Sequence, residues 1–253
     1  MQMIIKERDS EEFVFIEQHH HAYVSYELIK NLKDSFVKDE TYKASLLEAV
    51  RLHDCGWRYV DKQPFWNIEE NKPYDFTDFP LSAKVMVYEM GINEVEQKDL
   101  YAALLCSVHY TKFIMSDSEV DAKIFVEKEK LRQEKIMHQL GRINKHLFEY
   151  HYALLQFADS LSLYFCLNDP GVSQDEVHFF FREGIHLPFA NTEDKLMPLW
   201  DDKGTVHLDP FPFQSSINIE LQQKRIHMED IKRHGLIPCY EANAFETVYI
   251  TIK

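Results

Sequence analysis

The stretch TYKASLLEAVRLHDCGW, residues 41–57, decides how the chain is expected to fold. Its apolar residues recur at helical spacing, and Asp54 falls on the same face as Val50. Gly56 follows where helices tend to end, so the pair His53-Asp54 is predicted to close a helix. An acid on an apolar helix face is costly unless it is paired or binds a metal. The stretch therefore predicts a helical core with ligand-type side chains pointing inward.

Two further helices are each predicted to carry one ligand-type side chain in apolar surroundings. The stretch QKDLYAALLCSVHYTKFIM, residues 97–115, is apolar nearly all round and contains His109. The stretch HLFEYHYALLQFADSLSLYFCL, residues 146–167, contains Asp159 and ends before NDPG, a strong turn signal. Because charged carboxylates seldom lie in such helices without a partner, three separate helices are predicted to point polar groups inward.

The rest of the N-terminal two thirds is also predicted to be mainly helical. The first helix begins near the histidines of HHHAYVSYELIKNL, residues 19–32. The stretch LSAKVMVYEMG predicts a short helix with Gly91 beyond its end, and residues 119–150 predict helix with a solvated charged face. Residues 61–80 mix prolines with aromatic residues, which is typical of an ordered loop that could wall a pocket.

Beyond Gly171 the pattern changes from helical spacing to alternation of apolar and polar residues, which predicts β-strands. Turn-forming segments such as DPFPF separate these runs. The predicted strands are VHFFF (177–181), TVHLD (205–209), SINIELQQKRI (216–226) and TVYITIK (247–253).

The predicted fold class is therefore α+β, with a mainly α-helical core and a small antiparallel β-sheet from the C-terminal region. The N-terminal run EFVFI, residues 12–16, could join that sheet. We expect residues 1–171 to form the helical core with its N-terminal strand, and residues 172–253 to form a β-rich extension packed on it as one compact unit.

The composition is typical of a globular protein, and the net charge indicates which kinds of molecule the protein could bind. The 253 residues carry a formal net charge of -14, which disfavours binding to nucleic acid. A small phosphorylated molecule remains compatible, because a divalent metal can supply the missing positive charge. The four cysteines are scattered and show no CxxC pairing, and no stretch resembles a signal peptide or a membrane span. A cytoplasmic protein without membrane contact is expected.

The order of the candidate ligands is His21, then His53-Asp54, then His109, then Asp159. This order resembles the H…HD…H…D pattern of the HD superfamily of metal-dependent phosphohydrolases. Four stretches are more closely similar to a bacterial branch of that superfamily that is known only as a domain of unknown function. The resemblance covers most of residues 15–171, and its stretches are QHHHAYVSYEL (18–28), AVRLHDCGWRYVDKQP (49–64), LYAALLCSVHY (100–110) and LLQFADSLSLYFCLNDPG (154–171).

The resemblance implies a metal site in which His109 is available to a second ion or to the substrate. One or two divalent transition-metal ions are expected, of manganese, iron, zinc or nickel. His20 stands directly before His21, where similar proteins are expected to have an acid, so either histidine could be the ligand. The ligands implied for the first ion are His21, His53, Asp54 and Asp159.

The implied reaction is hydrolysis of a small phosphoester or nucleotide, with Asp54 orienting the nucleophile. Lys112 follows His109 by one helical turn and could contact a phosphate, as could Arg58 and Lys62. The candidate catalytic residues are therefore Asp54, His109 and Lys112. Asp61 is expected to cap a loop or form a salt bridge rather than bind metal.

Two other functions fit the same sequence. The first is a regulatory protein that binds a metal or a ligand on an HD core without turnover. The second is an oxygenase, since an HD core can also hold a di-iron centre. The β-rich tail could cover the pocket or pair two copies of the chain, so a homodimer is compatible with each function.

Overall fold

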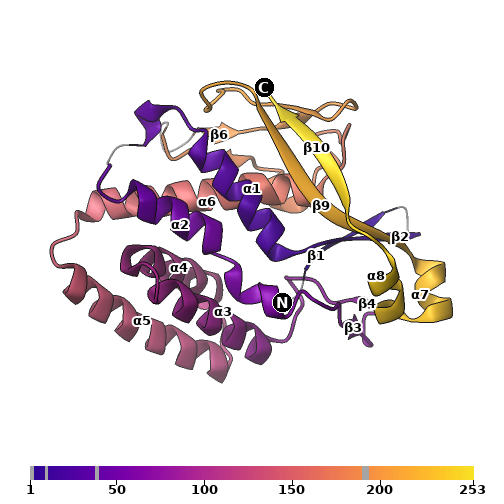
Figure 1. Cartoon of the computed structure of the whole chain (residues 1–253), viewed down its shortest axis with the longest axis horizontal. Helices are drawn as coiled ribbons and strands as arrows, with labels where there is room; N and C mark the ends of the chain where they lie inside the picture. The colour runs from indigo at the N-terminus through magenta and orange to yellow at the C-terminus, as the bar shows by residue number, and fades with distance from the viewer. Residues whose placement is uncertain (1–2, 9–10, 38–39, 190–193) are drawn as a thin grey trace.

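The computed structural model describes residues 3–8, 11–37, 40–189 and 194–253. It shows an α+β fold, in which a group of helices packs against one side of a long, curved sheet (Figure 1). The predicted fold class is confirmed. The helices are α1 (Gln18–Lys30), α2 (Lys43–Leu52), α3 (Leu81–Glu96), α4 (Leu100–Ile114), α5 (Val120–Leu140), α6 (Lys145–Leu167), α7 (Met228–His234) and α8 (Leu236–Ala242).

The strands and the 3-10 helices are short apart from two long C-terminal strands. The 3-10 helices are η1 (Asp34–Phe36), η2 (Cys55–Tyr59) and η3 (Phe179–Phe181). The strands are β1 (Ile4–Arg8), β2 (Glu12–Ile16), β3 (Trp66–Asn67), β4 (Lys72–Pro73), β5 (Ile185–His186), β6 (Lys195–Leu196), β7 (Leu199–Trp200), β8 (Thr205–His207), β9 (Ile217–His227) and β10 (Glu246–Ile252).

The main sheet has six strands in the order β1-β2-β9-β10-β8-β7. Its pairs are antiparallel except for the parallel pair of β8 and β10. The N-terminal hairpin joins the C-terminal strands through β2 and β9, with Phe13 opposite Ile226, as the apolar run at residues 12–16 suggested. Inward residues alternate with outward ones along β9, which lets Ile219 and Leu221 pack toward the helices.

One large hydrophobic core joins the helices to the sheet. It contains Leu28 of α1, Leu161 of α6, Ile219 of β9 and Ile250 of β10. α1 lies between the other elements, because it contacts α2 and α6 on one side and β9 on the other. The four cysteines are free and buried. Among the described residues, none of the helices combines the length and the apolar character that crossing a membrane requires.

The run VHFFF does not form the predicted strand. Phe179–Phe181 form the 3-10 helix η3, which is capped by the His178 ring and fixed by a hydrogen bond from the His178 amide to Asn168 Oδ1 at 2.8 Å. Only Phe181 of this helix enters the core, while Phe179 and Phe180 stay exposed. The three phenylalanines are consecutive in the sequence and do not alternate with polar residues. A short helix therefore accommodates them better than a half-buried strand, in which every second side chain points inward.

Gly91 does not end its helix, because α3 continues to Glu96. Gly91 lies instead where α3 approaches η2, the turn that follows His53-Asp54. A Cβ added at Gly56 would lie 2.3 Å from the Val87 carbonyl oxygen, and one at Gly91 would lie 3.0 Å from the Gly56 nitrogen. The two glycines thus allow the backbones of α3 and η2 to touch, and this contact positions Asp54.

Replacing Gly56 by alanine is expected to lower the free energy of unfolding by about 1–3 kcal/mol, the usual cost of forcing an extra group into a packed interior. The added methyl group would meet the backbone of α3, which can move away only by shifting η2. Chemical denaturation measures the effect. Ser82→Ala on the exposed face of α3 is the control, and an equally small change in both variants would contradict the close approach.

Candidate metal centre

The five predicted ligands lie together in the middle of the helical part of the fold. His21 is on α1, His53 and Asp54 follow α2, His109 is on α4 and Asp159 is on α6. Each of the five residues is no more than 8% exposed. We call this group the inner cluster.

Three atoms of the inner cluster lie within 3.6 Å of one another, namely the Nε2 atoms of two histidines and one oxygen of Asp159. His21 Nε2 lies 3.2 Å from His53 Nε2 and 3.1 Å from Asp159 Oδ1, and His53 Nε2 lies 3.6 Å from that oxygen. Ligands about 2.1 Å from one ion are about 3.0 Å apart in octahedral and about 3.4 Å apart in tetrahedral geometry. The three side chains thus have the spacing of ligands to a single metal ion, and together they could hold one.

The Nδ1 atoms of His21 and His53 are held by hydrogen bonds, so that the Nε2 atom of each ring faces the middle of the inner cluster. His53 Nδ1 donates to the Val50 carbonyl oxygen at 2.7 Å. The Ser162 hydroxyl donates its proton to the Asp159 backbone carbonyl oxygen at 2.9 Å. Ser162 Oγ lies 2.5 Å from His21 Nδ1 and can therefore accept a hydrogen bond from that nitrogen. In their neutral forms both rings would therefore direct the Nε2 lone pair at the same point, which is the orientation that metal-binding histidines require.

Asp54 lies against the same two rings. Its Oδ2 atom is 3.5 Å from His21 Nε2 and 3.5 Å from His53 Nε2. Its other oxygen, Oδ1, accepts a hydrogen bond from the Tyr110 hydroxyl at 2.8 Å. The same hydroxyl touches the His53 carbonyl oxygen, so Tyr110 fixes the orientation of the His-Asp pair.

Asp159 faces two different sets of histidines with its two oxygens. Oδ1 lies near His21 and His53, whereas Oδ2 lies 3.6 Å from His109 Nε2. His109 Nδ1 is buried and has no hydrogen-bond partner among the described residues. His109 is thus placed at the edge of the three-ligand group, next to a carboxylate that can bridge two ions.

The electrostatics of the inner cluster favour a cation. Burial disfavours the charged form of the His53 ring, but Asp54 and Asp159 outweigh it and raise the pKa of His53 to about 9. Burial also disfavours the Asp159 carboxylate, yet hydrogen bonds to His21 and His53 hold its pKa below the ordinary value. His109 also contacts Asp159, but burial outweighs that carboxylate and, with the neighbouring His53 ring, lowers the pKa of His109 to about 4. The negative charge that retains protons on His21 and His53 would equally attract a metal ion.

Metal binding to the inner cluster is expected to release protons. In the metal-free protein the pKa of His53 is raised to about 9, so the ring is protonated below that pH and must lose its proton to bind a metal. Affinity is therefore expected to fall as the pH is lowered below about 9, and protons are expected to be released on binding near neutrality.

Calorimetric titration with Zn²⁺ in two buffers of different ionisation enthalpy measures this release. His53→Ala is expected to lose both the binding heat at this site and its buffer dependence, because it removes a ligand that is also the titrating ring. Equal binding heats in both buffers for the unaltered protein would contradict the expected protonation.

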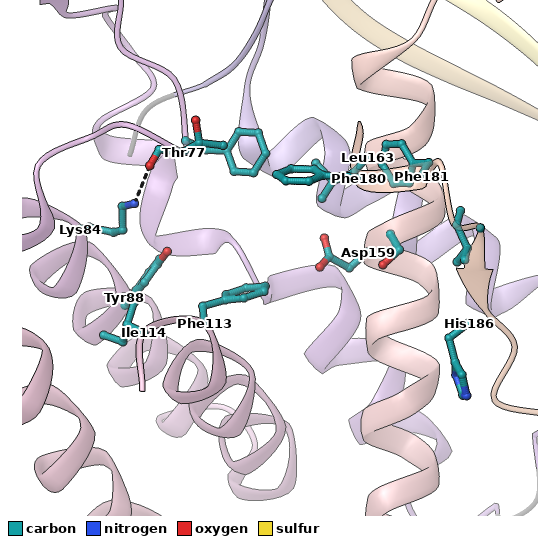
Figure 2. Close-up of a pocket in the computed structure, with 14 residues that line it drawn as sticks. Thr77, Lys84, Tyr88, Phe113, Ile114, Asp159, Leu163, Phe180, Phe181 and His186 are labelled. Atoms are coloured by element: carbon teal, nitrogen blue, oxygen red, sulfur yellow. Dashed lines mark hydrogen bonds between the residues drawn. The ribbon is translucent and has the colours of Figure 1, made fainter. Parts of the chain in front are cut away.

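A cavity of about 500 Å³ opens beside the inner cluster. Figure 2 shows the Asp159 carboxylate pointing into it from α6, between Phe113 of α4 and Phe180 of η3. The residues 61–80, predicted to wall a pocket, contribute Phe76 and Thr77. The cavity is therefore mainly apolar, with several aromatic rings, and the acid of the inner cluster lies at its wall.

The three cations predicted to meet a phosphate lie away from this cavity. Lys112 is exposed, with its Nζ atom 4.1 Å from the centre of the Tyr152 ring. Arg58 pairs with Glu94 at 2.6 Å, and Lys62 lies over the Tyr59 ring. The structure thus brings together the predicted ligands but does not place these cations beside them.

The cavity has one lysine that the sequence did not single out. Lys84 of α3 lines it, and its Nζ atom donates to the Thr77 carbonyl oxygen at 3.3 Å (Figure 2). Tyr110 and Ser162, which orient the ligands, were also not predicted. Ser162 had a detectable signal, since it follows Asp159 by one helical turn on the same face.

The choice between His20 and His21 is clear in the structure. His21 lies in the inner cluster, whereas the His20 ring points away from it toward Phe245. Successive helical residues are rotated by about 100°, so only one of the three histidines can face α6. Asp61 was expected to cap a loop or form a salt bridge. Its Oδ2 atom accepts a hydrogen bond at 2.8 Å from the backbone N–H of Gln18, the first residue of α1.

Comparisons with known proteins identify the family but no function. Searches among curated proteins and among solved structures found no match. Residues 3–228 match the family described as "Protein of unknown function (DUF3891)", and this match spans the helical part, the inner cluster and most of the sheet. The chain therefore belongs to the DUF3891 family.

Proposed function

We propose that this protein is a metal-dependent phosphohydrolase of the HD type that acts on a small phosphoester or nucleotide. The observation that carries the proposal is the position of Asp159. One of its oxygens lies with His21 and His53, the other faces His109, and the carboxylate borders a cavity. A site that only stabilised the fold would need neither the additional histidine nor an opening.

The chain order of the ligands also supports the proposal. His21, His53-Asp54, His109 and Asp159 come from four separate parts of the helical core, in the order that resembles the HD superfamily. His21, His53, Asp54 and Asp159 would hold a first divalent ion, and His109 with Asp159 Oδ2 would face a second ion or the substrate. A bound ion would lower the pKa of a coordinated water and polarise a phosphoryl oxygen.

The remaining groups would orient the reactants. Asp54 keeps Oδ2 directed at the centre because Tyr110 occupies Oδ1, so it can align an attacking water. Lys84 supplies a positive charge within the cavity and could pair with a phosphate. The rings of Phe113 and Phe180 offer apolar surface for stacking on the rest of the substrate. The cavity therefore suits a phosphoester with a planar or apolar group, such as a nucleotide.

A panel assay tests the proposal. Untagged protein loaded with manganese, iron, zinc or nickel is incubated with phosphomonoesters, phosphodiesters and nucleotides, and released phosphate or nucleoside is measured. We expect metal-dependent turnover of at least one class, which is lost in His53→Ala. Absence of turnover with every metal would overturn the proposal in favour of a regulatory role, and a visible absorption band of the iron form in air without hydrolysis would favour the di-iron oxygenase.

A further inference from the structure

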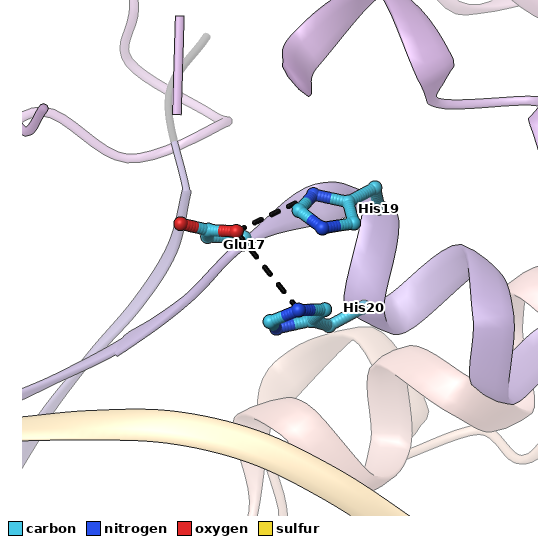
Figure 3. Close-up of side chains that lie close together, drawn as sticks. All are labelled: Glu17, His19 and His20. Carbon is cyan, nitrogen blue, oxygen red and sulfur yellow. Dashed lines mark ion pairs between the residues drawn. The ribbon is translucent and has the colours of Figure 1, made fainter. Parts of the chain in front are cut away.

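A second group of metal-binding side chains lies at the start of α1, on the side opposite to the inner cluster. Glu17 directly precedes the helix, and His19 and His20 lie in its first turn. Figure 3 shows both rings next to the Glu17 carboxylate. His19 Nδ1 lies 3.4 Å and His20 Nε2 lies 4.0 Å from the same oxygen, Oε2. We call Glu17, His19 and His20 the outer cluster.

The Glu17 carboxylate is held by residues from the other end of the chain. The Tyr240 hydroxyl of α8 donates to Glu17 Oε1 at 3.2 Å, which leaves Oε2 for the two histidines. Lys224 of β9 in turn fixes Tyr240, because its Nζ atom donates to the Tyr240 carbonyl at 2.8 Å and lies over the Tyr240 ring. The ligand oxygen of the outer cluster thus has the supporting partners that orient carboxylates in metal sites.

The histidine rings are packed but leave nitrogens without partners. The His20 ring packs edge-on against Phe245, with the ring centres 5.4 Å apart, and lies 4.3 Å from the His19 ring centre. The Nδ1 atoms of His19 and His20 are buried and have no hydrogen-bond partner among the described residues. A buried nitrogen without a partner is unfavourable, and a cation between His19 Nδ1 and Glu17 Oε2 would satisfy both atoms.

We propose that the outer cluster binds a divalent transition-metal ion of the zinc type, independently of the inner cluster. Two ligands about 2.1 Å from an ion are at most about 4.2 Å apart, and the contacts of 3.4 Å and 4.0 Å to Glu17 lie within that limit. One ligand atom from each of the three residues lies within 4.8 Å of the other two, so the group could hold a metal ion. Two imidazoles and one carboxylate form an open three-ligand set, which leaves a coordination position for water or another ligand.

The open position would face a second cavity, of about 410 Å³, which is lined by both histidines of the outer cluster. Two arginines also line this cavity, but each is paired with an acid. Arg58 pairs with Glu94 at 2.6 Å, and Arg51 pairs with Glu48 at 2.7 Å. Their charges are thus largely balanced, so these arginines would not exclude a cation from the outer cluster.

Equilibrium dialysis of the full untagged chain against Zn²⁺, followed by elemental analysis, tests the outer cluster. The double variant His19→Ala, His20→Ala is expected to bind one equivalent fewer than the unaltered protein, and Glu17→Gln is expected to bind zinc at least ten-fold more weakly at this site. Both variants are checked by circular dichroism. Because Glu17→Gln keeps size and the Tyr240 contact, it tests the site even if the double variant folds poorly.

The matched control is His146→Ala, which removes an exposed histidine that lies 3.8 Å from Glu149. It is expected to bind as much zinc as the unaltered protein. Full zinc binding by the double variant would overturn the proposal, and so would an equal loss in the control, which would indicate adventitious binding by surface histidines. Asp159→Asn, which alters only the inner cluster, is expected to keep the outer ion, so failure of the proposed phosphohydrolase and failure of this site are distinguishable.

Discussion

Asp159→Asn is expected to abolish metal binding at the inner cluster. Asparagine keeps the shape of the side chain but removes the charge and replaces one of the two oxygens that face His21, His53 and His109. Loss of a group that merely supports a ligand costs about 10–100-fold in metal affinity, so loss of the bridging ligand itself should exceed about 100-fold. Elemental analysis after dialysis should show at least one equivalent of metal fewer than in the unaltered protein.

Ser160→Ala is the control for this variant. Ser160 is the next residue on α6 and lines the same cavity, yet it contributes no group to the inner cluster. Its metal content should equal that of the unaltered protein. Retention of all the metal by Asp159→Asn would refute the ligand role of this carboxylate.

His109→Gln is expected to separate catalysis from metal binding. Within the inner cluster, His109 contacts Oδ2 of Asp159 and not the oxygen that faces His21 and His53. The ion held by His21, His53 and Asp54 should therefore stay bound. A group that positions a second ion or transfers a proton typically contributes about 100-fold or more to the rate. The turnover number for the best substrate of the panel should therefore fall by that factor, while elemental analysis still finds the first ion.

Lys112→Ala is the matched control on the same helix, one turn after His109. Its Nζ atom lies over Tyr152 rather than in the cavity, so its loss should leave the turnover number close to that of the unaltered protein. Equal activities of the His109→Gln variant and the unaltered protein would contradict the placement of His109 in the reaction site.

The candidate ligands were predictable because each is anomalous in its local sequence. Asp159 is an acid in a helix whose neighbours are almost all apolar, and the structure confirms that it is buried. The start of α1 at the histidines and the joining of β2 to β9 also followed from spacing and alternation. Sequence patterns identify such features because burial and periodicity act over a few residues.

Other features depend on contacts that local patterns do not contain. Gly91 resembled a helix end, but its role is to let α3 touch η2, which lies far away in sequence. Lys112 lies one turn from His109, but Lys84, from another helix, is the lysine that lines the cavity. The partner of Glu17 is Tyr240, more than two hundred residues later. The three residues of the outer cluster are neighbours in the sequence, but the support of Glu17 by Tyr240 becomes visible only when the C-terminal segment packs on α1.

Crystallographic anomalous scattering from protein soaked with Mn²⁺ or Zn²⁺ tests the account most directly. We predict a peak about 2.0–2.2 Å from His21 Nε2, His53 Nε2 and an oxygen of Asp159. In the opposite result, no anomalous peak would lie between these side chains at saturating metal, and the side chains would be joined to one another by hydrogen bonds. That result would contradict the metal centre.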